Sequence, residues 1–151
     1  MFQNKKPVIA IDGTASSGKG TLAKKLSKST GFDHLDSGLL YRVYAYEFLK
    51  KSKNFSEIEN VTIDFSLFSD FDRLSDINLR SEEVSKAASL IAKSKYVRKS
   101  LINIQRKIAD NPKGGKGSVI DGRDITSVII PKAEIKFYVD ANIEVRAKRR
   151  Q

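Results

Sequence analysis

The sequence predicts an α/β fold in which a parallel sheet, flanked by helices, is interrupted by a mostly helical insertion. At both ends of the chain, short apolar runs alternate with segments of helical periodicity, as in β–α–β units. The long middle stretch is mainly helical in its periodicity. The 151 residues suit about one globular domain, and the absence of cysteine excludes disulfides, thiolate metal sites and a cysteine nucleophile.

Each predicted strand is a short apolar run, and the strands are expected near residues 8–12, 34–36, 118–121 and 135–139. Each predicted helix carries an apolar stripe, and the helices are expected at residues 19–30, 37–51, 81–92, 94–108 and 142–150. Residues 52–80 indicate short helices or irregular structure, and the glycine-rich segment 111–117 indicates a loop. On this division, residues 1–36 and 118–151 form the core and residues 37–117 form the insertion.

The formal net charge of +10 favours an anionic partner, although a lysine-rich solvated surface explains it equally well. No helix-turn-helix or RNP-type aromatic pattern supports nucleic-acid binding, and no apolar run approaches the length of a membrane span. The basic N-terminus is not followed by the apolar stretch of a secretory signal, so a cytoplasmic location is expected. A single histidine, His34, excludes a histidine-rich metal site.

A phosphate-binding loop is predicted where Gly13 and the pair Gly18-Lys19 are separated by four residues, the Walker A spacing. The segment follows an apolar run and opens a helical pattern, so its backbone N–H groups and the helix N-terminus would converge on phosphate oxygens. Lys19 would add a positive charge at the β- and γ-phosphates. The alternative is a flexible glycine- and serine-rich turn. The residues expected to bind phosphate are Gly13, Thr14, Ala15, Ser16, Ser17, Gly18, Lys19, Gly20 and Thr21.

Two further polar blocks follow predicted strands, where ligands bind in open α/β sheets. The first is Asp36-Ser37-Gly38 with Tyr41-Arg42, and its arginine can bind phosphate through two hydrogen bonds. The second is Asp121-Gly122-Arg123-Asp124, in which the glycine would permit a tight turn. Taken alone, Ser37 is explained as a helix cap, Tyr41 as a core or rim residue and the second block as a salt-bridged turn.

Together these blocks resemble the bacterial cytidylate kinase family. The resembling segments cover most of the chain in the family's order: IAIDGTASSGKGT (9–21), LDSGLLYR (35–42), RSEEVSKAAS (80–89), YVRKSLINIQR (96–106) and VIDGRDITSVIIPKAEIKFYVDANIEVRAKRR (119–150). The resemblance implies a P-loop kinase core, with residues 37–117 as the part that binds the nucleoside monophosphate. It also implies transfer of the γ-phosphoryl group of ATP to CMP or dCMP, with Mg²⁺.

The same resemblance assigns roles to individual residues. Lys19 and Arg123 would be catalytic. The implied substrate contacts are Arg42 and Arg123 for the CMP phosphate, Ser37 for the ribose, and Ser89, Arg98 and Asp124 for the cytosine edge, with Tyr41 and Asp121 in the same blocks. Without the resemblance, Ser89 and Arg98 would be assigned to a solvated helix face. No protein ligand to a metal is predicted, because Gly20 stands where a hydroxyl would contact Mg²⁺, and the family holds the metal largely through phosphates and water.

The chain also departs from the family pattern. Thr14 replaces the usual proline, a change expected to matter little, and the insertion over residues 52–80 is short, so its small sheet is expected to be reduced. The last helix runs to Gln151 without a breaker, so we expect the chain to be cut where an arginine-rich lid begins; Arg146, Arg149 and Arg150 match that beginning. The family suggests a monomer, but an uncovered sheet edge is expected to favour self-association.

Two alternative functions remain open at this point. The first is another small-molecule P-loop kinase, although such a kinase would not need the block around Ser37 and Arg42. The second is a catalytically weak nucleotide-binding fragment, because the arginines of the lid would be missing.

Overall fold

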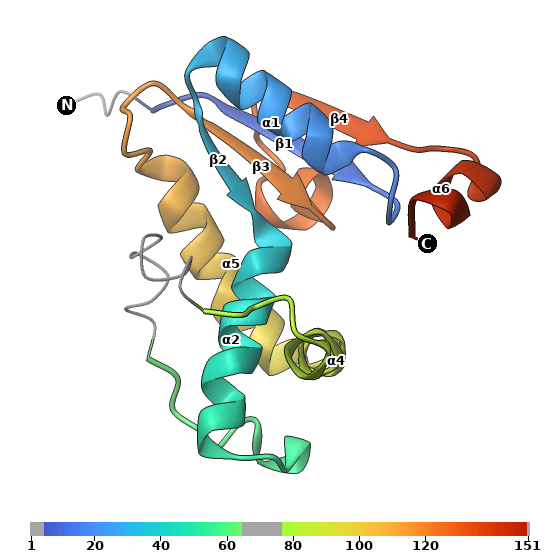
Figure 1. Cartoon of the computed structure of the whole chain (residues 1–151). Helices are drawn as coiled ribbons and strands as arrows, with labels where there is room; N and C mark the ends of the chain where they lie inside the picture. Colours follow the sequence, from blue (N-terminus) through green and yellow to red (C-terminus); the bar gives the residue numbers. More distant parts are fainter. Residues whose placement is uncertain (1–4, 65–76, 151) are drawn as a thin grey trace. The chain divides into compact units, whose positions relative to one another are not determined.

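The structure, a computed structural model, describes residues 5–64 and 77–150 and confirms the predicted α/β fold (Figure 1). Four strands form one parallel sheet in the order β2-β3-β1-β4. The strands are β1 (Val8–Gly13), β2 (Asp33–Asp36), β3 (Ser118–Gly122) and β4 (Ile135–Val139). The α-helices are α1 (Lys19–Thr30), α2 (Ser37–Lys51), α4 (Glu82–Ile91), α5 (Lys95–Asp110) and α6 (Ile143–Arg150). The described residues also form a short 3-10 helix, η1 (Phe55–Glu57), and a π-helix, η3 (Ile125–Ile129).

The chain divides into two compact units. Unit 1 comprises Met1–Ser37 and Ile104–Gln151, and unit 2 comprises Gly38–Asn103. Unit 2 contains fewer residues than the expected insertion at residues 37–117, because its C-terminal boundary falls inside α5. That unit 2 binds a nucleoside monophosphate remains a prediction.

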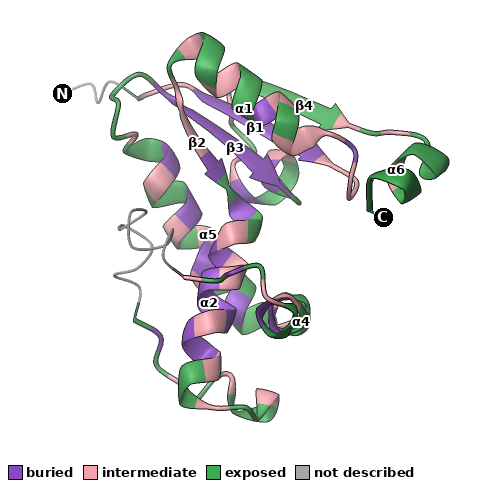
Figure 2. Cartoon of the chain, viewed as in Figure 1, coloured by how far each residue is buried: buried purple, intermediate pink, exposed green. Residues whose placement is uncertain are grey.

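In unit 1, the core lies where α1 packs on the central strands. Ile9 and Ile11 of β1 and Val119 of β3 are buried together with Ala23 of α1. The outer strand β4 differs, because its residues are largely exposed (Figure 2). Since all four strands are parallel, their carboxyl ends lie at the same edge of the sheet. That edge is where the phosphate loop and the block at residues 121–124 leave their strands.

In unit 2, apolar stripes on α2, α4 and α5 form the core, as the periodicity predicts. Tyr44 and Phe48 of α2 are fully buried, and Phe48 packs against the ring of Phe55. Burial, followed by the nearby Tyr96 hydroxyl, raises the pKa of Tyr44 to about 12. The predicted cap of α4 is confirmed, because the Ser81 hydroxyl accepts a hydrogen bond from the Val84 N–H at 3.2 Å.

Residues 52–80 lie partly outside the described residues, and residues 125–129 form an element that the sequence did not predict. Among residues 52–64 and 77–80 the structure contains η1 and no strand, and the remainder of the segment, 65–76, lies outside the described residues. The π-helix η3 was not predicted at all. In the parts of the chain that the structure describes, none of the helices has both the length and the apolar character needed to cross a bilayer.

Candidate functional site

The phosphate loop connects β1 to α1, and its two glycines are required for different reasons. A Cβ on Gly13 would lie 2.3 Å from the Val139 carbonyl oxygen, because β1 and β4 are paired at this point. Gly18 has φ +99°, a backbone conformation that side chains disfavour. Gly13 therefore allows β1 and β4 to lie close together, and Gly18 allows the backbone to turn into the helix. The backbone of Ser16 also has a left-handed conformation, with φ 57°.

The first residue of the loop, Thr14, is bonded to the end of β4. Its N–H donates to the Val139 carbonyl oxygen at 3.3 Å, and its hydroxyl donates to the Asp140 carboxylate at 2.8 Å. The hydroxyl bond, followed by the Ala141 N–H, holds the pKa of Asp140 below its ordinary value. A proline at position 14 could make neither bond, since it has no N–H and no hydroxyl.

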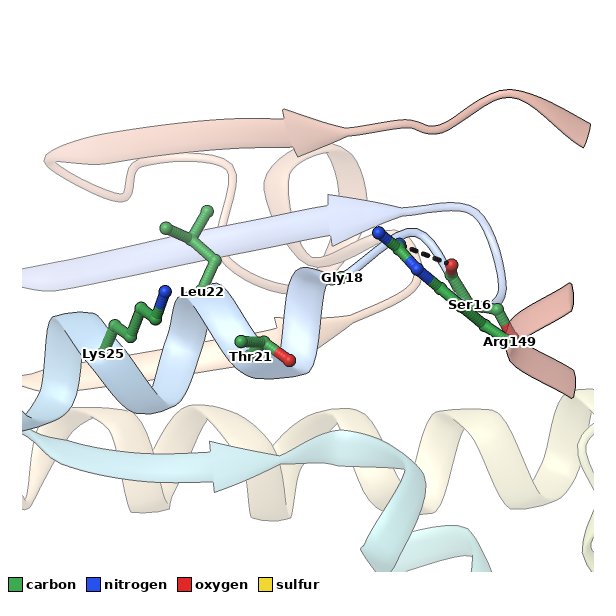
Figure 3. Close-up of a pocket in the computed structure, with 6 residues that line it drawn as sticks. All are labelled: Ser16, Gly18, Thr21, Leu22, Lys25 and Arg149. Carbon is green, nitrogen blue, oxygen red and sulfur yellow. Dashed lines mark hydrogen bonds between the residues drawn. The ribbon is translucent and has the colours of Figure 1, made fainter. Parts of the chain in front are cut away.

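A pocket of about 560 Å³ opens beside the loop and the first turns of α1 (Figure 3). The residues lining it are Ser16, Gly18, Thr21, Leu22, Lys25 and Arg149. Arg149, from α6, donates to the Ser16 carbonyl oxygen at 3.0 Å, so its guanidinium lies against the loop. Two cationic side chains and the N-terminus of a 12-residue helix thus face one concave surface, an arrangement that favours a phosphate group.

Ser17, inside the loop, gives independent support for a ligand. The residue is only 6% exposed, and its hydroxyl has no hydrogen-bond partner among the described residues. A buried hydroxyl without a partner is costly, and a bound group that accepts its hydrogen bond would offset that cost. Lys19 follows at the start of α1 and is half-buried.

At the ends of β2 and β3, Asp121 is buried against the α1 side of the sheet. Its side chain is 5% exposed, and its carboxylate is hydrogen-bonded to the ring Nε2 of His34. Its other oxygen lies 3.9 Å from the position that a Cβ on Gly20 would occupy. Asp121 therefore faces the first turn of α1, next to the phosphate loop. The sequence placed His34 in a strand and, with this single histidine, excluded a histidine-rich metal site, but it did not predict this pair.

The role expected of Gly122 has to be corrected. Gly122 belongs to β3 and is not among the described glycines with positive φ, so it does not serve a tight turn. It is required because a Cβ there would lie 1.8 Å from the Ser37 hydroxyl oxygen. Ser37 is itself 4% exposed. The two predicted blocks therefore meet directly at Ser37 and Gly122.

Beyond Gly122, the side chains of Arg123 and Asp124 are exposed, and Asp124 is left-handed with φ 58°. Neither side chain forms an ion pair with any residue in 5–64 or 77–150, so the described part of the chain does not support a salt-bridged turn. The backbone that follows is held by Asp12, whose carboxylate accepts three hydrogen bonds from Ile125 and Thr126. Sequence reasoning missed Asp12 as well.

The other candidate residues belong to unit 2. Arg42 is fixed within that unit, where it donates to the Leu79 carbonyl oxygen at 3.1 Å and to the Ser85 hydroxyl at 2.7 Å. Ser89 is exposed on α4 and donates back to the Ser85 carbonyl oxygen, and Arg98 is exposed on α5. Tyr41 is half-buried. The structure thus brings Ser37, Asp121, Arg123 and Asp124 to one end of the sheet, and places Tyr41, Arg42, Ser89 and Arg98 in the other unit.

Within the described residues, no group of three or more histidine, aspartate or glutamate side chains could enclose a metal ion. Two carboxylates lie beside the phosphate loop or the first turn of α1, and both are already engaged: Asp140 accepts from the Thr14 hydroxyl, and one oxygen of Asp121 is bonded to His34. These residues fit a cation held mainly by phosphate oxygens and water, and they do not fit an all-protein cage.

Comparisons with known proteins identify the family. The model of the family described as cytidylate kinase matches residues 9–151. The cytidylate kinase of Paramagnetospirillum magneticum is 42% identical over 95% of this chain and 67% of its own length. That of Bartonella tribocorum is 46% identical over 95% of this chain and 65% of its own length. The chain thus spans about two thirds of the length of these curated relatives. The match to the crystal structure of TT1252 from Thermus thermophilus covers 97% of this chain and 71% of that one, at 21% identity and with a TM-score of 0.47.

Proposed function

Because this chain belongs to the cytidylate kinase family, we propose that it transfers the γ-phosphoryl group of ATP to CMP or dCMP. The products would be ADP and CDP or dCDP. The observation that carries this proposal is the phosphate loop at the N-terminus of α1, with the buried and unpartnered Ser17 hydroxyl inside it. An ATP triphosphate supplies the acceptor that this hydroxyl lacks.

On the donor side, the backbone from Gly13 to Gly18, the α1 N-terminus and Lys19 would neutralise the phosphates. Lys25 and Arg149 add positive charge along the same pocket. Mg²⁺, when bound, would withdraw charge from the phosphate oxygens, and Asp121, which faces the first turn of α1, would hold one of its waters. A phosphoryl transfer that is catalysed by position and charge needs these groups and no protein nucleophile.

On the acceptor side, the CMP phosphate is already anionic, so its attacking oxygen requires no general base at neutral pH. Arg42 and Arg123 would bind this phosphate, and Ser37 would bind the ribose. Asp124 is exposed and unpaired within the described residues, so it can accept a hydrogen bond from the cytosine amino group. Arg98 can donate to cytosine O2 and N3. These assignments rest on the family pattern.

The test is product formation from ATP, Mg²⁺ and CMP, followed by ion-exchange separation of CDP and ADP. We expect stoichiometric CDP and ADP with CMP, and slower turnover with UMP, because a site built for an amino group leaves its acceptor unpaired with a carbonyl. ATP incubated without an acceptor measures hydrolysis. Tight ATP binding without CDP formation would instead support the catalytically weak nucleotide-binding alternative.

A further inference from the structure

The segment that carries Arg123 and Asp124 is held at both ends by side chains that have no assigned role. After β3, the backbone passes through the left-handed Asp124 and enters the π-helix η3. The N–H groups of Val128 and Ile129 both bond to the Asp124 carbonyl oxygen, at 3.0 and 2.9 Å. Both the left-handed residue and the π-helix are uncommon in proteins, and they are frequent at functional sites.

At the start of η3, the contact comes from Asp12, the last polar residue of β1 before the phosphate loop. Its carboxylate accepts from the Ile125 N–H at 2.8 Å, from the Thr126 N–H at 2.9 Å and from the Thr126 hydroxyl at 2.5 Å. Asp12 is only 6% exposed, so these bonds replace the water that the ionised carboxylate has lost. Both carboxylate oxygens are used within unit 1.

At the end of η3, the contact comes from Arg106 on α5. Its Nε donates to the Ile129 carbonyl oxygen at 2.8 Å, and its Nη2 donates to the Val128 carbonyl oxygen at 3.1 Å. The guanidinium therefore satisfies two carbonyls that the short helix leaves free. Asp12 and Arg106 come from different elements and do not contact the pocket beside α1.

We propose that Asp12 and Arg106 are positioning residues that hold Arg123 and Asp124 in place for the nucleoside monophosphate. The proposal rests on the proposed function for the identity of that ligand. Because Asp124 directly precedes Ile125, a shift of the Ile125 N–H moves the Asp124 side chain with it. The phosphate loop is held separately, through Thr14 and Arg149. Loss of either positioning residue therefore weakens CMP binding and leaves ATP binding unaffected.

The kinetic test compares Asp12→Asn, Arg106→Gln and Arg106→Lys in the same chain. Asp12→Asn and Arg106→Gln should each raise KM for CMP by about tenfold, which is the loss of one hydrogen bond to a charged group. KM for ATP should stay within about twofold of the parent value, because the phosphate loop is untouched. Arg106→Lys keeps one donor and should recover part of the loss. Lys107→Gln, an exposed neighbour on α5 with the same change of charge, is the matched control.

A second measurement separates this proposal from the proposed function. Amide hydrogen exchange of Ile125 and Thr126, followed by NMR without nucleotide, should accelerate in Asp12→Asn while the amides of β1 and β3 stay protected. If the parent chain makes no CDP, the proposed function fails, and the exchange result still tests the positioning contact. Equal increases of KM for both nucleotides, or unchanged exchange at Ile125 and Thr126, would overturn the proposal.

Discussion

Replacing Gly122 by alanine tests the closest contact at the end of the sheet. A Cβ at this position would lie 1.8 Å from the Ser37 hydroxyl oxygen, 3.0 Å from Ser37 Cβ and 3.2 Å from Ile125 Cδ1. Real Cβ atoms essentially never approach another heavy atom within 3.0 Å. The strand or the start of α2 must therefore move, and Ser37 is too deeply buried to swing into solvent.

The expected cost follows from the severity of this overlap. Adding a methyl group to a packed interior costs about 1–3 kcal/mol, and the 1.8 Å contact places Gly122→Ala at the upper end, about 3 kcal/mol. For a chain of this size, each kcal/mol lowers Tm by roughly 2–4 °C, so we expect a decrease of about 6–12 °C. Gly20→Ala is the matched control, because a Cβ there would meet only Asp121 Oδ2, at 3.9 Å. That change lies in α1 and should be neutral or stabilise by up to about 1 kcal/mol.

Urea denaturation of Gly122→Ala, Ser37→Ala, Ser37→Gly and the two double variants measures the coupling. Ser37→Ala removes the 1.8 Å overlap but leaves the 3.0 Å one, and Ser37→Gly removes both. The stability lost in Gly122→Ala should thus be recovered in part when Ser37→Ala is added and more fully when Ser37→Gly is added, after the cost of each Ser37 substitution alone is subtracted. A loss in Gly122→Ala no larger than in Gly20→Ala, or no recovery in either double variant, would refute the steric reasoning.

Four further outcomes are expected. Lys19→Ala should abolish CDP formation while Tm and circular dichroism stay near the parent; turnover within about tenfold, or 1.4 kcal/mol, would contradict a main charge contact. Asp124→Ala should raise KM for CMP more than KM for ATP and reduce the preference for CMP over UMP, whereas equal losses would make its role structural. Thr14→Val should raise the lowered pKa of Asp140 towards its ordinary value in an NMR titration of the carboxyl carbon. The lowered pKa of Asp140 stabilises the fold above the ordinary pKa, and this contribution is lost as pH falls through the lowered value. The difference in stability between the parent and Thr14→Val should therefore vanish in acid. A difference that does not change with pH would exclude this linkage. Tyr138, 70% exposed on the outer strand β4, should promote self-association, so Tyr138→Lys should lower the weight-average mass in sedimentation, and an unchanged mass would place the contact elsewhere.

Most of the regular elements were predictable because their signals are local. The apolar run before Asp12 and the stripe through Leu40, Tyr44 and Phe48 carry their own periodicity, and both are buried as expected. The π-helix η3 has no such signal. Its first N–H group, that of Ile125, donates to the carboxylate of Asp12, 113 residues earlier in the chain, so the sequence around Ile125 does not predict the helix.

The same distinction applies to the site. The phosphate loop was predictable because its glycines and Lys19 lie within seven consecutive residues. The His34–Asp121 pair joins residues 87 positions apart, and only the register of β2 with β3 brings them together. For Gly122, the residue type was correctly singled out but the reason was wrong, because a close contact with Ser37 leaves no trace in local sequence.

The bond between Thr14 and Asp140 has a consequence for the order of events during synthesis. These two residues are separated by 126 positions, and the strand that precedes Asp140 pairs directly with β1. While the ribosome is still making the middle of the chain, β1 is available, but neither β3 nor β4 exists to flank it. The entry to the phosphate loop therefore becomes ordered only when residues near 140 have left the ribosome. Until then the apolar central strand depends on helix α1 alone for cover, and this interval is when the nascent chain is most exposed to aggregation and to chaperones.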